Sequence, residues 1–135
     1  EGRPPEVNLL NEKNNGDIVL KLIEKGLVNT VHDISSGGLI LALSEMSVAS
    51  EIGVKIDKPK KLRNFSEYLF GEDQGRYIME VEDEKIANVE KTLNTNNIYY
   101  EIIGITQKNF FEIEGEMKLD TNDLFKINSQ WYNNY

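Results

Sequence analysis

The chain has 135 residues, 23 of them acidic and 15 basic, and a formal net charge of −8 at pH 7. This balance argues against a nucleic-acid backbone as partner, which needs clustered Lys and Arg side chains to release counterions. The lack of cysteine excludes disulfides, thiolate metal sites and cysteine nucleophiles, and the single histidine excludes a multi-histidine metal cluster. No apolar stretch approaches the length of about 18 residues that spans a membrane, so we expect a cytoplasmic protein that binds neither membranes nor nucleic acid.

The first eight residues predict an extended linker. Pro4 and Pro5 each fix their own φ and bias the preceding residue away from the helical region. The chain begins with Glu1 rather than methionine, which is typical of a piece cut from a longer protein. We therefore expect a linker over residues 1–8 and a single α/β domain over residues 9–135.

Hydrophobic periodicity predicts helices and strands in alternation along that domain. Residues 9–25 form an amphipathic helix with Asn8 as its N-cap and Gly26 at its C-terminal end. The other expected helices are 39–50, a short turn at 65–69, 83–94 and 122–131, and the expected strands are 28–32, 52–57, 76–81, 98–105 and 110–113.

The first four strands and the helices between them follow the order β-α-β-β-α-β, with additions at both ends: a helix before them, and the strand 110–113 and a helix after them. This is the order of ferredoxin-like α+β folds, in which helices cover one face of a mixed or antiparallel sheet. Because that architecture hosts many functions, a function has to be argued from particular sites.

The first candidate site is the segment 32–38, which we call the glycine turn, placed where a strand passes into a helix. Its candidate ligand-binding residues are Asp33, Ser35, Ser36, Gly37 and Gly38. A glycine pair lets the backbone approach a ligand closely, and the first N–H groups of the following helix can bind a phosphate or carboxylate. The alternative is a tight connection in which Ser35 or Ser36 caps the helix.

His32 opens the same turn and could serve as an acid or base, because the unperturbed pKa of histidine lies near neutrality. The sequence identifies no partner for it. A structural histidine at the end of a strand is the simpler interpretation.

The second candidate site is the segment 71–77, which we call the acidic turn, flanked by glycines and leading into a strand. Glu72 and Asp73 could bind a cation or the hydroxyl groups of a ligand, and Gln74 offers both a donor and an acceptor. The alternative is that the two carboxylates are solvated or cap the turn. We assign no metal site and no acid/base pair to these residues.

Three segments together resemble the last domain of the phosphoribosylformylglycinamidine synthases. They are VHDISSGGL at 31–39, ALSEM at 42–46 and LFGEDQGRY at 69–77. The resemblance covers nearly the whole chain and is specific, because the glycine turn and the acidic turn occur in the family's order with a helix and a strand between them.

The resemblance implies the C-terminal domain of the aminoimidazole ribonucleotide synthetase superfamily. Enzymes of this family amidate formylglycinamide ribonucleotide in purine synthesis, using ATP, magnesium and ammonia delivered from glutamine. The short form of the enzyme works with separate glutaminase and small accessory subunits, which become the expected partners together with the preceding domains. The family's catalytic histidine and most of its ATP and magnesium ligands lie in those preceding domains, so we expect no catalytic residue and no tightly bound cofactor here.

One position departs from the family. Ser36 stands where the family usually has aspartate, which removes a carboxylate and argues against a metal site in the glycine turn. Two alternatives to a ligand-cleft domain of this synthase stay open: a noncatalytic module that docks sister domains or accessory subunits, and another ligase or kinase of the superfamily, such as the selenophosphate or thiamine-phosphate enzymes.

Overall fold

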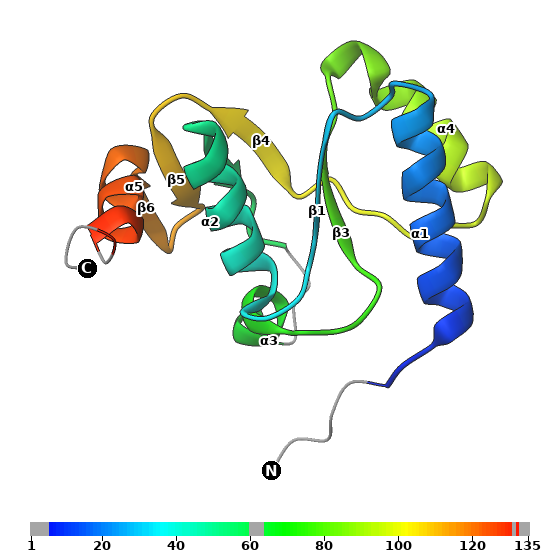
Figure 1. Cartoon of the computed structure of the whole chain (residues 1–135), viewed down its shortest axis with the longest axis horizontal. Coiled ribbons are helices and arrows are strands. Elements are labelled where there is room, and N and C mark those ends of the chain that lie inside the picture. Colours follow the sequence, from blue (N-terminus) through cyan, green and yellow to red (C-terminus); the bar gives the residue numbers. More distant parts are fainter. Residues whose placement is uncertain (1–5, 60–63, 131, 133–135) are drawn as a thin grey trace. The chain divides into compact units, whose positions relative to one another are not determined.

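The computed structural model describes residues 6–59, 64–130 and 132, and the chain folds into two compact units (Figure 1). Unit 1 consists of Glu1–Ala42 and Phe70–Glu101, and unit 2 consists of Leu43–Leu69 and Ile102–Tyr135. In the described part of the chain, no helix combines the length and the apolar character that crossing a membrane requires.

Unit 1 is built on a two-stranded antiparallel ribbon flanked by helices. Its elements are α1 (Leu9–Glu24), β1 (Thr30–Asp33), the start of α2 (Gly38–Ser50), β3 (Tyr77–Glu80), the 3-10 helix η1 (Asp83–Lys85) and α4 (Ile86–Thr95). Strand β1 pairs with β3 in a register that sets Thr30 opposite Glu80 and Asp33 opposite Tyr77.

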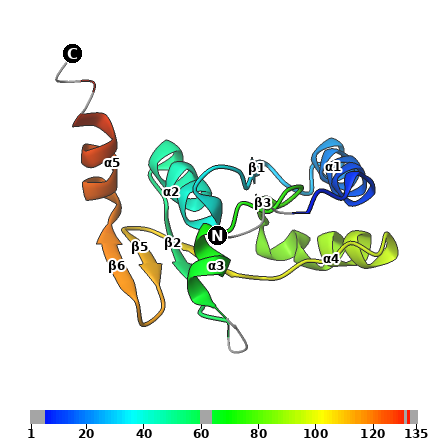
Figure 2. The same cartoon turned by 90° about the horizontal axis from the view of Figure 1, so that it is seen from below.

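The core of unit 1 lies where α1 and α4 run side by side (Figure 2). The buried residues in contact there are Ile18, Leu22, Val28, Val89 and Leu93. The pairs 18/22 and 89/93 are each spaced by four residues, which places them on one face of their helix. Asn8 is the N-cap of α1, as predicted, since its side-chain oxygen accepts the N–H of Asn11 at 3.1 Å.

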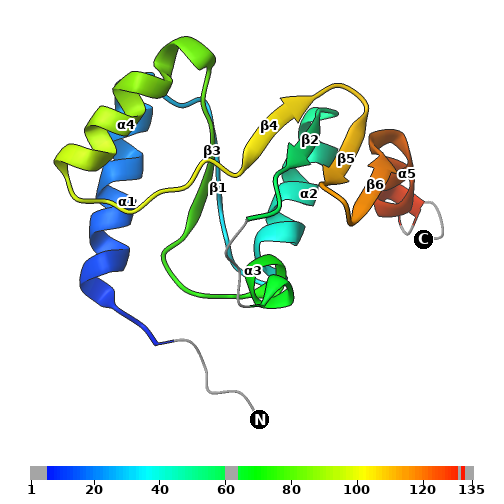
Figure 3. The same cartoon turned by 180° about the vertical axis from the view of Figure 1, so that it is seen from behind.

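Unit 2 contains a four-stranded mixed sheet (Figure 3). Its elements are the rest of α2, β2 (Gly53–Ile56), α3 (Phe65–Phe70), β4 (Gly104–Gln107), β5 (Phe110–Ile113), β6 (Met117–Asp120) and α5 (Thr121–Gln130). The strand order is β4-β2-β5-β6, in which β2 and β5 run parallel and the other neighbours run antiparallel.

Alternate side chains of β5 lie on the two faces of this sheet, one of which is buried and the other charged. Phe111 and Ile113 are buried, whereas Glu112 lies between Lys55 of β2 and Lys118 of β6 in the register. The Glu112 carboxylate is 3.1 Å from the Lys118 ammonium and 4.0 Å from that of Lys55. The hydrogen bond from Lys118, more than any other contact, holds the pKa of the Glu112 carboxyl below its ordinary value.

The structure confirms the mixed α+β class and the predicted order, which appears as β1-α2-β2-β3-α4-β4. Among the described residues the strands divide between two sheets. The predicted strand 98–105 was wrong in extent, because only Gly104–Gln107 forms a strand, and β6 was not predicted.

Two other predictions are not decided by this fold. The prediction of one domain over residues 9–135 stays a prediction. Most of the predicted linker, residues 1–5, lies outside the described residues.

Candidate functional site

The glycine turn and the acidic turn meet in unit 1 because β1 and β3 are antiparallel partners. The glycine turn leaves β1 at the end where the acidic turn leads into β3, since Asp33 stands opposite Tyr77. The pairing continues one step further, because the Ile34 N–H donates to the Arg76 carbonyl oxygen at 2.9 Å. The two segments, 35 residues apart in sequence at their point of contact, therefore form one surface.

A direct hydrogen bond joins the turns. The backbone N–H of Gly37 donates to Oε1 of Glu72 at 2.8 Å, and the N–H of Gly38 donates to the Ser35 carbonyl oxygen at 3.1 Å. Gly37 directly precedes α2, whose first turn contains no acidic residue. Glu72 therefore supplies, from a distant part of the chain, the negative charge that the N-terminal end of a helix favours.

Gly37 is a position in this turn where a side chain does not fit. Its φ is +79°, which residues with a Cβ atom rarely adopt, and a Cβ built there would lie 2.6 Å from Cδ2 and 2.7 Å from Cβ of Leu41. The glycine is thus required both by backbone conformation and by packing against α2.

The acidic turn is held in shape by hydrogen bonds to its own carbonyl groups. The guanidinium of Arg76 donates to the carbonyl oxygens of Gly71 and Asp73 and lies 3.7 Å from the Asp73 carboxylate. The Asn15 amide, on α1, donates to the Gly75 carbonyl oxygen at 2.9 Å. Arg76 and Asn15 position this turn, although sequence reasoning assigned a site role to neither.

The candidate side chains are displayed toward solvent. Six candidate residues are exposed: Asp33, Ser35, Ser36, Glu72, Asp73 and Gln74. The Gln74 side chain makes no hydrogen bond to the described part of the chain. The surface therefore offers carboxylates, hydroxyls and one amide as hydrogen-bonding groups for a polar ligand.

Two details bear on the predicted chemistry of the glycine turn. The N–H groups of Gly37 and Gly38, predicted to face an anion, both have protein acceptors in this structure. Among the residues that the structure describes, no three His, Cys, Asp or Glu side chains gather as a metal site would require. His32 is partly buried, and its Nδ1 lies 2.6 Å from the Asp33 carbonyl oxygen.

Replacing Glu72 by alanine is expected to lower the free energy of unfolding by about 1 kcal/mol, because the N-terminal end of α2 loses its charged acceptor. Urea denaturation followed by circular dichroism measures the change. The control is Glu114→Ala, which removes another exposed glutamate, from the turn between β5 and β6. Equal stability of the Glu72 variant and the wild type would contradict the role of Glu72 as a helix cap.

The sequence matches the family described as AIR synthase related protein, C-terminal domain, over residues 1–113. Two similar proteins are both named phosphoribosylformylglycinamidine synthase subunit PurL. The one from Pelagibacter ubique is 42% identical over 134 residues, which is 99% of this chain, and the one from Rhodopseudomonas palustris strain TIE-1 is 37% identical over 135 residues. The chain spans 18% of the length of each relative.

Solved structures show the same fold. Thermotoga maritima PurL complexed with ADP superimposes with a TM-score of 0.76 at 16% identity, covering 93% of this chain and 26% of that one. The same protein complexed with FGAR gives a TM-score of 0.72 at 19% identity, covering 84% of this chain and 21% of that one. These matches confirm the resemblance that the glycine turn and the acidic turn indicated. The chain belongs to the family of AIR synthase related protein C-terminal domains.

Proposed function

We propose that this chain is the C-terminal part of an ATP-dependent ligase that amidates formylglycinamide ribonucleotide to formylglycinamidine ribonucleotide in purine biosynthesis. Within that enzyme the joined glycine and acidic turns form one wall of a ligand cleft, and preceding domains form the rest. The observation that carries this role is the hydrogen bond between Gly37 and Glu72, which joins the glycine turn and the acidic turn into one surface. Relatives named as subunits of this synthase, aligned over the whole chain, support the reaction.

Each candidate residue has a role that its chemistry suits. Glu72, Asp73 and Gln74 bind hydroxyl or amide groups of the ligand, and Asp33, Ser35 and Ser36 line the opposite turn. Gly37 and Gly38 allow the backbone to come close to the ligand. The groups that carry out the reaction come from preceding domains, so the isolated chain is inactive.

ATP and magnesium belong to the complete enzyme in this proposal. Thermotoga maritima PurL is described as complexed with ATP, which supports nucleotide use. No group of three or more His, Cys, Asp or Glu ligands gathers among the described residues, and the proposal assigns the ion to the preceding domains. Glutaminase and small accessory subunits are the proposed partners, in the cytoplasm.

A noncatalytic docking module is the second candidate, and the outer face of α1 favours it. Leu9, Leu10, Leu20 and Ile23 on that helix are between 47% and 73% exposed. A helix in a folded protein rarely exposes so many aliphatic side chains on one face. Such a face usually packs against another surface. The docking role and the cleft role involve different residues and can therefore be separated by mutation.

Replacing Gln74 by alanine in the complete synthase tests whether this side chain contacts the ligand or only supports the structure of the acidic turn. We expect the Michaelis constant of one substrate or of ATP to rise about tenfold, because the ligand loses a hydrogen-bond partner worth about 1 to 3 kcal/mol. The thermal midpoint should stay at the wild-type value, since the Gln74 side chain is exposed and makes no hydrogen bond to described residues.

The matched control is Gln107→Ala, the same substitution at a structural glutamine. The Gln107 amide donates to the carbonyl oxygens of Val54 at 3.1 Å and Phe110 at 3.0 Å. Its variant should melt at a lower temperature with normal Michaelis constants. If Gln74→Ala behaves like this control, the acidic turn is scaffold and the proposed cleft role is wrong.

A further inference from the structure

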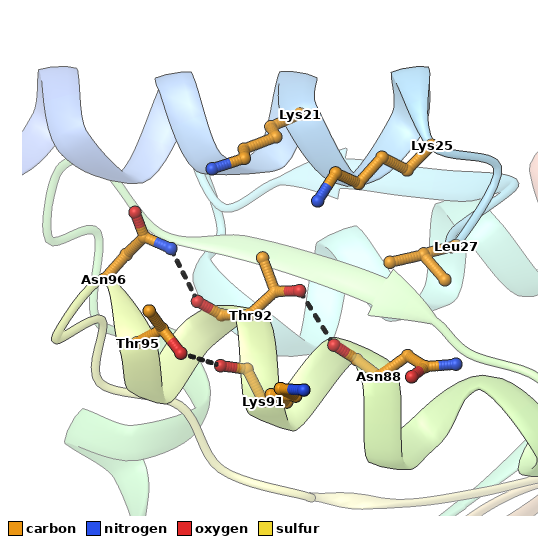
Figure 4. A pocket seen from close by; sticks show the side chains of 8 residues that line it. All are labelled: Lys21, Lys25, Leu27, Asn88, Lys91, Thr92, Thr95 and Asn96. Atoms are coloured by element: carbon orange, nitrogen blue, oxygen red, sulfur yellow. Dashed lines mark hydrogen bonds between the residues drawn. The ribbon is translucent and has the colours of Figure 1, made fainter.

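A polar groove lies between α1 and α4 in unit 1, away from the residues of the two turns (Figure 4). Its volume is about 500 Å³. The side chains that line it are Lys21, Lys25, Leu27, Asn88, Lys91, Thr92, Thr95 and Asn96. The groove contains no carboxylate and no aromatic ring in its lining.

Three lysines give this groove a positive charge within a chain whose net charge is −8. Lys21 and Lys25 extend from α1 toward α4 in Figure 4. Within the described part of the chain no carboxylate lies within ion-pairing distance of the three ammonium groups. Because Lys21 lies in the last turn of α1 and Lys25 directly follows the helix as its C-cap, their like charges repel each other, and a bound anion would relieve that repulsion.

Three neutral side chains at this groove already donate hydrogen bonds to the backbone of α4. The Thr92 hydroxyl donates to the Asn88 carbonyl oxygen at 2.8 Å, and the Thr95 hydroxyl donates to the Lys91 carbonyl oxygen at 2.7 Å. The Asn96 amide donates to the Thr92 carbonyl oxygen at 2.7 Å. These donors are already bound to the backbone of α4, which leaves the ammonium groups as the charged donors that face the groove.

We propose that this groove binds a small oligophosphate anion through Lys21, Lys25 and Lys91. A diphosphate carries several negative charges on closely spaced oxygens, and ammonium groups form strong charge-assisted hydrogen bonds with such oxygens. A ligand with one phosphate neutralises the three lysines less completely and binds more weakly. With no aromatic side chain to stack a base, the groove recognises the phosphates and not a nucleoside.

Titration of the full 135-residue chain with inorganic pyrophosphate, by calorimetry at low ionic strength, tests the proposal. We expect saturable binding of one pyrophosphate with a dissociation constant at or below about 1 mM, and binding at least about tenfold weaker for Lys21→Gln combined with Lys25→Gln. Orthophosphate should bind more weakly than pyrophosphate. ADP should bind about as well as pyrophosphate, and clearly tighter binding of ADP would contradict recognition of the phosphates alone.

The control is Lys13→Gln, which removes one positive charge from α1 outside the groove, where Lys13 pairs with Asp17. Circular dichroism melting shows that each variant is folded. Pyrophosphate affinity should be nearly unchanged in this control. The proposal fails if the folded wild-type chain shows no saturable binding up to about 10 mM pyrophosphate, or if the double variant binds as tightly as the wild type.

Discussion

Replacing Gly37 by valine is expected to lower the free energy of unfolding by about 2 to 4 kcal/mol. A β-branched residue is an outlier at a φ of +79°, and its Cβ would lie within 2.7 Å of two atoms of the Leu41 side chain. In the complete synthase the same change should impair turnover, because Gly37 carries the N–H that joins the two turns. Urea denaturation and steady-state kinetics on one preparation measure both effects.

Gly115→Val separates the cost of backbone conformation from the cost of crowding. Gly115 also has a positive φ, of +71°, but no atom lies within 4 Å of a Cβ built there. This control should lose only the strain of the unfavourable φ, about 1 to 2 kcal/mol, and should keep normal kinetics. Equal losses of stability and activity in both variants would remove the argument that the glycine turn is special.

Truncating Phe111 to alanine is expected to lower the free energy of unfolding by about 3 to 5 kcal/mol. The ring is fully buried, at 0% exposure, so its loss removes apolar burial and leaves a cavity in unit 2. Phe110→Ala is the matched control on the same strand, since the Phe110 ring is only partly buried and lies 4.3 Å from the Lys118 ammonium. The control should lose about 1 kcal/mol.

The Phe111 variant also tests whether residues 9–135 fold as one domain. Its unfolding should be followed by hydrogen exchange at two buried residues, Leu22 in unit 1 and Ile56 in the sheet of unit 2. If Leu22 loses protection together with the sheet of unit 2, the chain unfolds as one cooperative domain. If Leu22 keeps its wild-type protection, the prediction of a single domain is wrong.

Local patterns were enough to predict most helices and strands. The spacing of Val89 with Leu93 marks the buried face of α4, and Asn8 was recognisable as the N-cap of α1. The glycine turn and the acidic turn stand out as breaks in this periodicity. Most of the helices and strands, and both candidate motifs, could therefore be predicted from the single sequence.

The segment 98–103 shows where periodicity misleads. Ile98 and Tyr100 pack against the core of unit 1, whereas Tyr99 and Glu101 are exposed, so partly buried and exposed side chains alternate as they do in a strand. A strand also needs a partner, which alternation alone does not reveal. The missed strand β6 follows a short loop around Gly115, whose positive φ is typical of hairpin connections.

The contact between Gly37 and Glu72 could not be predicted, because it depends on the register of β1 against β3. Long-range pairing leaves no local signal in one sequence. One indirect indication existed: α2 has no acidic residue in its first turn, so a charged acceptor would have to come from another segment. The same holds for Asn15, which reaches the Gly75 carbonyl group across 60 residues of sequence.

The Glu72 carboxylate has a consequence for selectivity. It is attached to the protein and already occupies the Gly37 N–H, so it competes with any dissolved anion at the high local concentration that tethering creates. Chloride, acetate and other simple anions of the cell solution are at a disadvantage in that exchange. An anion displaces the carboxylate only if it makes further contacts at the same time. The tethered carboxylate therefore disfavours the binding of weak, monovalent anions at the Gly37 N–H.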